Sequence, residues 1–308
     1  MNKKIRLFTL STATIIPLVT IACQKTTQEQ KTFNSKYIYT DSEYYKGLDG
    51  LKGVQLFDEL VKIQNRYWTK NTQRKESNYS ELYKIYPRAF KDNFYEKDNT
   101  VLDIYSENPK GSDPYNFDFK HFDGKGGVDT GKNIKGEGNK YNREHLIPQS
   151  WFDRNEQVRT DAHFVWPTDK KVNELRGNSI FAPTPNGKKS LNGTLTSKLT
   201  SEPIDEFKGD VARAMFYFVL THDEYSKQSN FIFEDKKPYI ASKYLEIYKD
   251  WAKKDAIDAF DIQRNNEIAK VYGGLRNPFC DYPELVDLIF NPGDKVFKDK
   301  GVLVSVAN

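Results

Sequence analysis

Cysteine is almost absent from this sequence. Only Cys23 and Cys280 occur among the 308 residues. Two cysteines cannot build a disulfide framework, and they cannot supply the several thiolates of a cysteine-based zinc site. We therefore expect a fold that is held by its core, in which Cys280 is a small buried residue.

The signature motifs of several enzyme classes are also missing. Leu146 follows His145, so the His-Glu-x-x-His pair of metalloproteases is absent, and Tyr141 stands where the inverted motif needs a histidine. The chain has no G-x-S-x-G elbow and no phosphate-binding loop that ends in Gly-Lys-Ser/Thr. These absences exclude the zinc proteases, the α/β-hydrolases and the P-loop nucleotide hydrolases.

The N-terminus has the pattern of a targeting segment. A basic start, MNKKIR, precedes an apolar run that ends at Cys23. This run is short for a spanning helix, and residues 1–22 are therefore predicted to be a signal peptide. A small residue followed by cysteine resembles a bacterial lipobox, which implies that Cys23 is lipidated. The alternative is an ordinary signal peptide, and both place the protein outside the cytoplasm.

Little net charge remains once this segment is removed. Residues 1–22 hold three basic residues and no acid, so the formal net charge falls from +4 to +1. A nearly neutral protein does not attract nucleic acid by net charge, and any affinity for phosphate must come from a local patch or a metal ion.

The rest of the chain is predicted to be α+β and mainly helical. Polar residues 23–45 are expected to form a tether, 46–295 a single domain and 296–308 a C-terminal tail. Apolar residues at helical spacing predict most of the elements. Helices are expected within 50–68, 77–90, 210–225, 238–255, 256–273 and 275–290, and a strand within 100–109. The Gly-rich stretch 122–140 is predicted to be a long loop, either a substrate lid or disordered.

The segment 141–182 carries the most unusual chemistry. We expect a strand that ends near His145, then a second strand over 161–166 that stops at Pro167. Thr168 is a suitable N-cap for the helix that follows. In this helix Asn173 and Arg176 are three residues apart and share one face.

This order of two strands and a helix is the outline of a ββα-metal finger. A neutral imidazole can take a proton from water, which makes His145 a candidate general base. Glu144 and Asn173 offer the hard oxygen atoms that Mg²⁺ prefers, and Ca²⁺ or Mn²⁺ fits the same donors. Arg176 can pair with a phosphate group and is a candidate catalytic residue.

One geometric difficulty accompanies this interpretation. Neighbouring residues of a regular strand point to opposite faces, so Glu144 and His145 cannot address one metal ion from within it. The strand must bend or end at 144–146, and Pro148 favours such an ending. The alternative for His145 alone is a packing residue at a strand end.

Four blocks in this order resemble the bacterial endonuclease I family of extracytoplasmic ββα-metal, or His-Me finger, nucleases. They are NREHLIPQSWF, DAHFVWPTDKKVNELRGN, KGDVARAMFYF and LRNPFCDYPELV. The resemblance covers roughly residues 100–290. It implies that His145 is the general base and that Glu144 and Asn173 bind the metal ion. It also places an architectural arginine at Arg213, for which a buried pairing with aspartate is expected.

The chain departs from the family pattern in places. Phe164 stands where the family commonly has asparagine, and Asp261 where it usually has glutamate. No family phosphate-binding arginine can be matched between 152 and 160. The candidate substrate-binding residues are therefore a broader set: Arg143, Asn178, Lys170, Arg154 and Arg159. Of the other histidines, His163 is expected to pack, and His121 and His222 to lie at the surface.

The sequence thus predicts a membrane-anchored nuclease on the extracytoplasmic face, with one divalent cation. Its predicted substrates are DNA and, as a second possibility, RNA, cut with little sequence preference, and it is expected to be a monomer. The alternative is a surface lipoprotein that binds a ligand or host component on an inactive nuclease scaffold.

Overall fold

The computed structural model describes residues 36–72, 79–120, 135–227 and 231–307. The predicted signal peptide, Cys23, most of the Gly-rich loop and His121 lie outside the described residues. Residues from Lys36 onward form one compact unit. None of the helices in the described ranges combines the length and apolar composition that a bilayer crossing requires.

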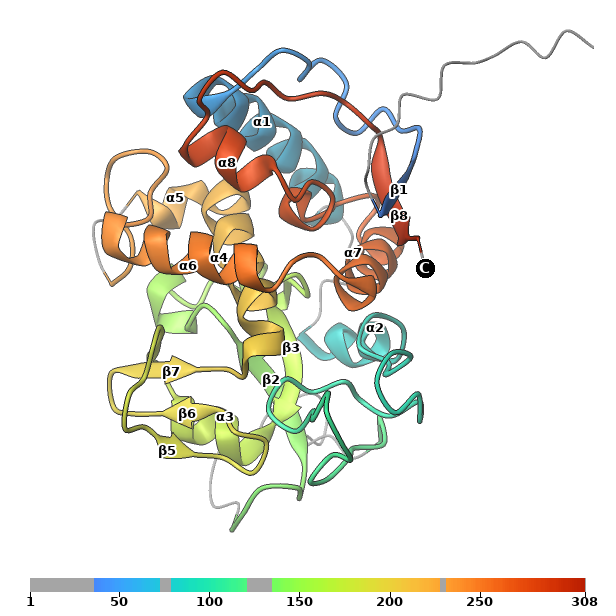
Figure 1. Ribbon diagram of the computed structural model, residues 1–308, viewed down its shortest axis with the longest axis vertical. Coiled ribbons are helices and arrows are strands. Elements are labelled where there is room, and N and C mark those ends of the chain that lie inside the picture. The colour runs from blue at the N-terminus through green and yellow to red at the C-terminus, as the bar shows by residue number, and fades with distance from the viewer. Residues whose placement is uncertain (1–35, 73–78, 121–134, 228–230, 308) are drawn as a thin grey trace, which may run out of the picture. The chain divides into compact units, whose positions relative to one another are not determined.

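The described chain is α+β and mainly helical, as predicted (Figure 1). The helices are α1 (Gly53–Thr72), α2 (Leu82–Ala89), α3 (Lys170–Arg176), α4 (Lys208–Thr221), α5 (Asp223–Ser226), α6 (Ser242–Lys254), α7 (Ala259–Val271) and α8 (Leu285–Phe290). The strands are β1 (Tyr37–Thr40), β2 (Tyr141–His145), β3 (Val165–Asp169), β4 (Ile180–Phe181), β5 (Lys188–Lys189), β6 (Leu195–Thr196), β7 (Thr200–Glu202) and β8 (Val302–Val306).

The strands form three small sheets. β2 pairs with β3 in antiparallel register, and β1 pairs with β8 in the same way. The third sheet has the order β4-β7-β6-β5, with only the β4–β7 pair parallel. Figure 1 shows this third sheet and α3 near β2 and β3. Small sheets of this kind cannot bury a core alone, so the helices supply most of the apolar surface.

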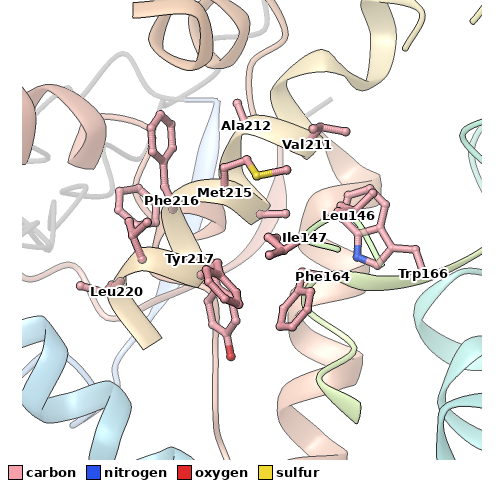
Figure 2. Packing of buried hydrophobic residues seen from close by; sticks show 14 of the residues in the cluster. Leu146, Ile147, Phe164, Trp166, Val211, Ala212, Met215, Phe216, Tyr217 and Leu220 are labelled. Carbon is pink, nitrogen blue, oxygen red and sulfur yellow. The ribbon is translucent and has the colours of Figure 1, made fainter. Parts of the chain in front are cut away.

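Helix α4 is buried along almost its whole length. A helix that is apolar on all sides belongs in a protein interior. Figure 2 shows Val211 and Met215 of α4 beside Ile147, Phe164 and Trp166, which come from the segments around β2 and β3. The central helix therefore packs against side chains around the end of β2 and the start of β3, where the site was predicted.

The ends of the chain take part in the fold. Residues 37–40, predicted to belong to a polar tether, form β1, and 302–306, predicted to be a tail, form β8. Each strand is short and only partly apolar, so neither gives a clear local signal. Their pairing depends on a partner at the opposite end of the sequence.

Two other local predictions were wrong. The strand expected within 100–109 is a single bridge between Lys91 and Val101, followed by turns. His222, expected at the surface, is fully buried, and its Nε2 lies 3.0 Å from Oδ2 of Asp161. Both errors arose because tertiary contacts override the local pattern. Cys280 is buried, as predicted.

A buried network of charges joins α4 to α7. Arg213 donates from Nε to Oδ1 of Asp261 at 3.0 Å, and from Nη1 to the main-chain oxygen of Asp255 at 2.8 Å. Arg264 pairs with Oδ1 of Asp210 at 2.7 Å and with Asp261 at 2.5 Å. The predicted aspartate pairing of Arg213 is confirmed. Because both arginines and the carboxylates of Asp210 and Asp261 are buried, the loss of one partner leaves an uncompensated charge.

We expect the Arg213→Met variant to lose about 3–5 kcal/mol of unfolding free energy, because Asp261 keeps only one of its two cationic partners. Urea denaturation measures this change. The control is Lys254→Met, which removes a cation from the exposed pair with Asp250 and should cost less than about 1 kcal/mol. Equal losses in the two variants would contradict a stabilising role for the network.

Candidate active site

The strands β2 and β3 and the helix α3 form one continuous motif. In the antiparallel register His145 lies opposite Val165, and Tyr141 lies opposite Asp169. Helix α3 begins at the residue after β3, so the chain turns directly from the strand into the helix. The end of β2 at His145 agrees with the expected strand ending, and Leu146 continues with one hydrogen bond to the oxygen of Phe164.

Asp169 caps helix α3, in place of the predicted Thr168. The Asp169 carboxylate accepts hydrogen bonds from the amides of Lys171 and Val172 at 2.7 and 2.9 Å. Thr168 lies within β3, because the strand continues through Pro167 instead of stopping there. Proline is tolerated at this position since a two-stranded ladder has an outer side where no N–H is needed.

Asn173 connects helix α3 to strand β2. Its Nδ2 donates to Oδ1 of Asn142 at 2.8 Å and to the main-chain oxygen of Arg143 at 3.2 Å. With both contacts made by the amide nitrogen, the amide oxygen is left for another partner. Asn142 was not predicted from the sequence, because a residue three positions before His145 on a strand is expected to point to the opposite face.

Arg176 holds the end of β2 in place. Its Nη1 donates to Oε1 of Glu144 and to the main-chain oxygen of His145, both at 2.7 Å. Further bonds run from Nη2 to the oxygen of Leu146 at 2.6 Å and from Nε to the oxygen of Ser179 at 3.0 Å. The guanidinium group is thus engaged inside the protein, and these contacts describe a positioning residue.

Glu144 is fully buried beside Arg176. Its second oxygen, Oε2, has no hydrogen-bond partner among the described residues, although the hydroxyl group of Tyr105 lies near the carboxylate. Burial raises the pKa of Glu144 to about 7, against the opposing effect of Arg176. Tyr105 is distant in sequence from the motif and lies in the segment 100–109, for which only a strand was predicted.

His145 lies at the edge of a pocket of about 300 Å³. Its Nε2 is 3.2 Å from the main-chain oxygen of Arg159. A carbonyl group only accepts, so Nε2 carries the ring proton and the lone pair of the neutral imidazole is on Nδ1. Burial lowers the pKa of His145 to about 3, and the charges of Arg143 and Arg159 act in the same direction. The ring is therefore neutral at neutral pH.

The pocket gathers many of the predicted residues, but not all of them. His145, Asn173 and Arg176 line it together with three candidate substrate-binding residues: Arg143, Arg154 and Asn178. Glu144, Lys170 and Arg159 do not line it. Since Arg176 both lines the pocket and contacts Glu144, the glutamate lies behind the pocket wall. Glu144 and His145, which are neighbours on β2, thus point to different sides of the strand, as strand geometry requires.

The predicted basic residues have different surroundings. The guanidinium group of Arg143 lies 4.9 Å from the ring centre of Tyr83. Arg159 forms an ion pair with Glu156, and its main-chain oxygen meets His145. Lys170 is buried at the start of α3, where burial lowers its pKa.

A strained turn forms one wall of the pocket. Asp153 and Arg154 both have left-handed backbone angles, with φ of 54° and 55°. Consecutive non-glycine residues in this region are rare and store strain, which often marks functional loops. The preceding short helix, Gln149–Phe152, places Gln149 and Ser150 on the pocket wall as well. Neither of these two residues was predicted.

The donor atoms at this site suit a hard divalent cation. The buried Oε2 of Glu144 has no hydrogen-bond partner among the described residues, and Asn173 makes both of its hydrogen bonds through the amide nitrogen, which leaves its amide oxygen available. A buried carboxylate oxygen is normally satisfied, and oxygen donors of these two types are those that Mg²⁺ takes. By donor type the two residues therefore fit a metal ion, although Asn173 lines the pocket and Glu144 lies behind its wall.

Comparison with known proteins shows to which protein family the chain belongs. A family model described as Endonuclease I matches residues 57–284. An extracellular ribonuclease of Bacillus subtilis (strain 168) is 28% identical over 260 residues, which cover 82% of this chain and 80% of that protein. An extracellular ribonuclease of Bacillus amyloliquefaciens is 33% identical over 157 residues, 49% of this chain and 54% of that protein. The chain is thus a nuclease. It belongs to the endonuclease I family, as its sequence motifs implied.

We expect Arg176→Lys to lower the unfolding free energy by about 3 kcal/mol, because a lysine cannot make the four bonds and leaves buried carbonyl groups unsatisfied. Urea denaturation tests this, with Arg66→Lys on the exposed face of α1 as the matched control. A variant as stable as the control would show that the four bonds contribute little.

Proposed function

We propose that this protein is an extracytoplasmic, metal-dependent endonuclease with His145 as its general base. The observation that carries the proposal is the state of His145, a neutral ring at the pocket edge whose Nε2 is turned to the oxygen of Arg159. In the neutral ring this contact places the proton on Nε2 and the lone pair on Nδ1, the atom proposed to accept the proton from water. A neutral imidazole held in one orientation is what general-base attack by water requires.

In the proposed reaction His145 takes a proton from water as the water attacks the phosphodiester, leaving 5′-phosphate and 3′-hydroxyl ends. Arg176 keeps the imidazole in position through the main-chain oxygen of His145. Glu144 and Asn173 would hold one divalent cation, with Mg²⁺ preferred over Ca²⁺ or Mn²⁺. When bound, such a cation stabilises charge on the phosphoryl oxygens and on the departing 3′ oxygen.

The pocket favours contact with the nucleic-acid backbone. Arg143 and Arg154 line it with cationic side chains, and Asn178 adds a neutral polar group. Contacts to phosphate position a substrate without reading its sequence. This supports cleavage with little sequence preference. Lys170 and Arg159 lie outside the pocket and are weaker candidates for substrate contact.

Both DNA and RNA are proposed as substrates. The motif resemblance alone favoured DNA, whereas the two relatives are named as ribonucleases. The reacting group is the same phosphodiester in both, and a pocket that contacts the backbone accommodates either. The second candidate, a binding protein on an inactive scaffold, is disfavoured because Glu144, His145 and Asn173 are all retained in a family member.

The proposed location is the outer face of the cell membrane. The lipobox-like sequence at Cys23 supports a lipid anchor, and the relatives are named as extracellular. Under this proposal residues 1–22 are removed and the mature chain begins at Cys23, as a monomer. A secreted form without the anchor is the alternative.

The His145→Ala variant should lose at least about 100-fold of the cleavage rate on plasmid DNA and on RNA, because no other group at the pocket replaces its base. Gel assays on both substrates measure the loss. The control is His222→Asn, which alters a buried histidine that the pocket does not include. Rates are compared per folded molecule. Retained cleavage in His145→Ala would rule out this base.

Removal of divalent cations with EDTA should abolish cleavage, and added Mg²⁺ should restore it. In Asn173→Ala the Mg²⁺ concentration for half-maximal rate should rise at least about tenfold, because one donor is lost. Isothermal titration with Mg²⁺ provides a readout that does not depend on activity. Full cleavage in EDTA would contradict the metal-dependent mechanism.

A further inference from the structure

A second group of acidic side chains lies in the loop between α2 and β2. Glu96, Glu107 and Asp113 each place a carboxylate oxygen within 4.8 Å of the other two. None of the three lines the pocket at His145. Acidic residues often cluster at protein surfaces, so proximity alone does not define a binding site.

Glu107 distinguishes this cluster from an ordinary acidic surface. Its side chain is only 1% exposed, and its Oε1 has no hydrogen-bond partner among the described residues. A buried carboxylate oxygen without a donor is costly, and such an atom in a native fold calls for a proton, a water or an ion. The same carboxylate contributes an oxygen to the group with Glu96 and Asp113, which are only partly buried.

The surrounding loop holds these carboxylates in place. Asp113 accepts a hydrogen bond from the amide of Asn108 at 2.7 Å. Asp92, a fourth acid nearby, accepts from the amides of Phe94 and Lys97. Burial raises the pKa of Glu107 to about 10, and the charges of Asp113, Glu96 and Asp92 add to the effect. Either a proton or a cation must therefore offset the crowding of negative charge.

We propose that Glu96, Glu107 and Asp113 bind a Ca²⁺ ion. All three donors are carboxylate oxygens, which Ca²⁺ takes in flexible geometry at about 2.3–2.6 Å. The three oxygens lie within 4.8 Å of one another, close enough to share one ion. Mg²⁺ demands near-ideal octahedral geometry at about 2.0–2.1 Å and keeps several waters, so a set of three carboxylates favours Ca²⁺.

The proposed ion would hold in place residues 103–107, a segment that contacts the active-site motif. Four residues before Glu107, Asp103 accepts a hydrogen bond from the amide of Asp169, the cap of α3, at 2.8 Å. Tyr105, which lies near Glu144, is part of the same turn. In addition, Asn192 donates to the main-chain oxygen of Glu107 at 3.3 Å. An ion that fixes Glu107 therefore fixes the segment that carries Tyr105 and supports α3.

The test uses the full-length protein and CaCl₂ as the probe. Isothermal titration and thermal unfolding are run on wild type, Glu107→Gln and Asp113→Asn. The matched control is Glu246→Gln, an exposed acid paired with Lys249 elsewhere on the surface. A second background, Asn173→Ala, removes a proposed donor of the active-site metal, so that Ca²⁺ binding there is not mistaken for binding at the cluster.

We expect wild type, Glu246→Gln and Asn173→Ala to bind Ca²⁺ and to unfold at higher temperature in its presence, with a Kd of about 10⁻³ M or tighter. Glu107→Gln and Asp113→Asn should bind at least tenfold more weakly. Asp113 is only partly buried, so this variant tests the site even if Glu107→Gln folds poorly. Unchanged titration in both variants would overturn the proposal. Absence of Ca²⁺ binding by Asn173→Ala up to about 10 mM would also overturn it, in which case Glu107 holds a proton.

Discussion

The ion pair between Arg176 and Glu144 is the contact on which the candidate active site depends. It joins the last turn of α3 to the end of β2 in the interior, and the same guanidinium group also binds three main-chain oxygens. A buried ion pair contributes little net stability, because desolvation of the two charges offsets their attraction. It nevertheless favours a single packing of α3 against β2, because displacing either side chain leaves a buried charge without a partner. The position of His145 follows from this arrangement, since its own carbonyl group is one of the four acceptors.

The same pair explains why one glutamate oxygen is satisfied and the other is not. Glu144 presents Oε1 to Arg176 and leaves Oε2 without a donor. The arginine thus orients the carboxylate as well as neutralising it. In the proposed metal site Glu144 would offer Oε2, and Arg176 already fixes the orientation of this carboxylate through Oε1.

Local patterns predicted the core of the site well. The strand expected to end near His145 and the helical spacing of Asn173 and Arg176 placed the end of β2 and the span of α3 to within a few residues. The contributions of Tyr105 and Arg159 were beyond local reasoning. Tyr105 reaches Glu144 from a distant turn, and Arg159 acts through its main-chain oxygen, which any residue type supplies.

Errors elsewhere had the same origin. His222 gives no sequence signal for burial, since its partner Asp161 lies in a different segment. The cap of α3 was misplaced by one residue because Pro167 was taken to end a strand that continues past it. Buried polar groups depend on pairing across the fold, and a single sequence does not reveal which pairs form.

The pairing of β1 with β8 closes the described chain into a loop almost as long as the chain itself. Gly301, with φ of +83°, lets this loop close, because a side chain there would collide with the main-chain oxygen of Thr40. Closing so long a loop carries a large entropic cost and comes late in folding. During synthesis β1 emerges long before β8 and has no strand partner until β8 has been made. A truncated product that lacks β8 therefore exposes the unpaired edge of β1.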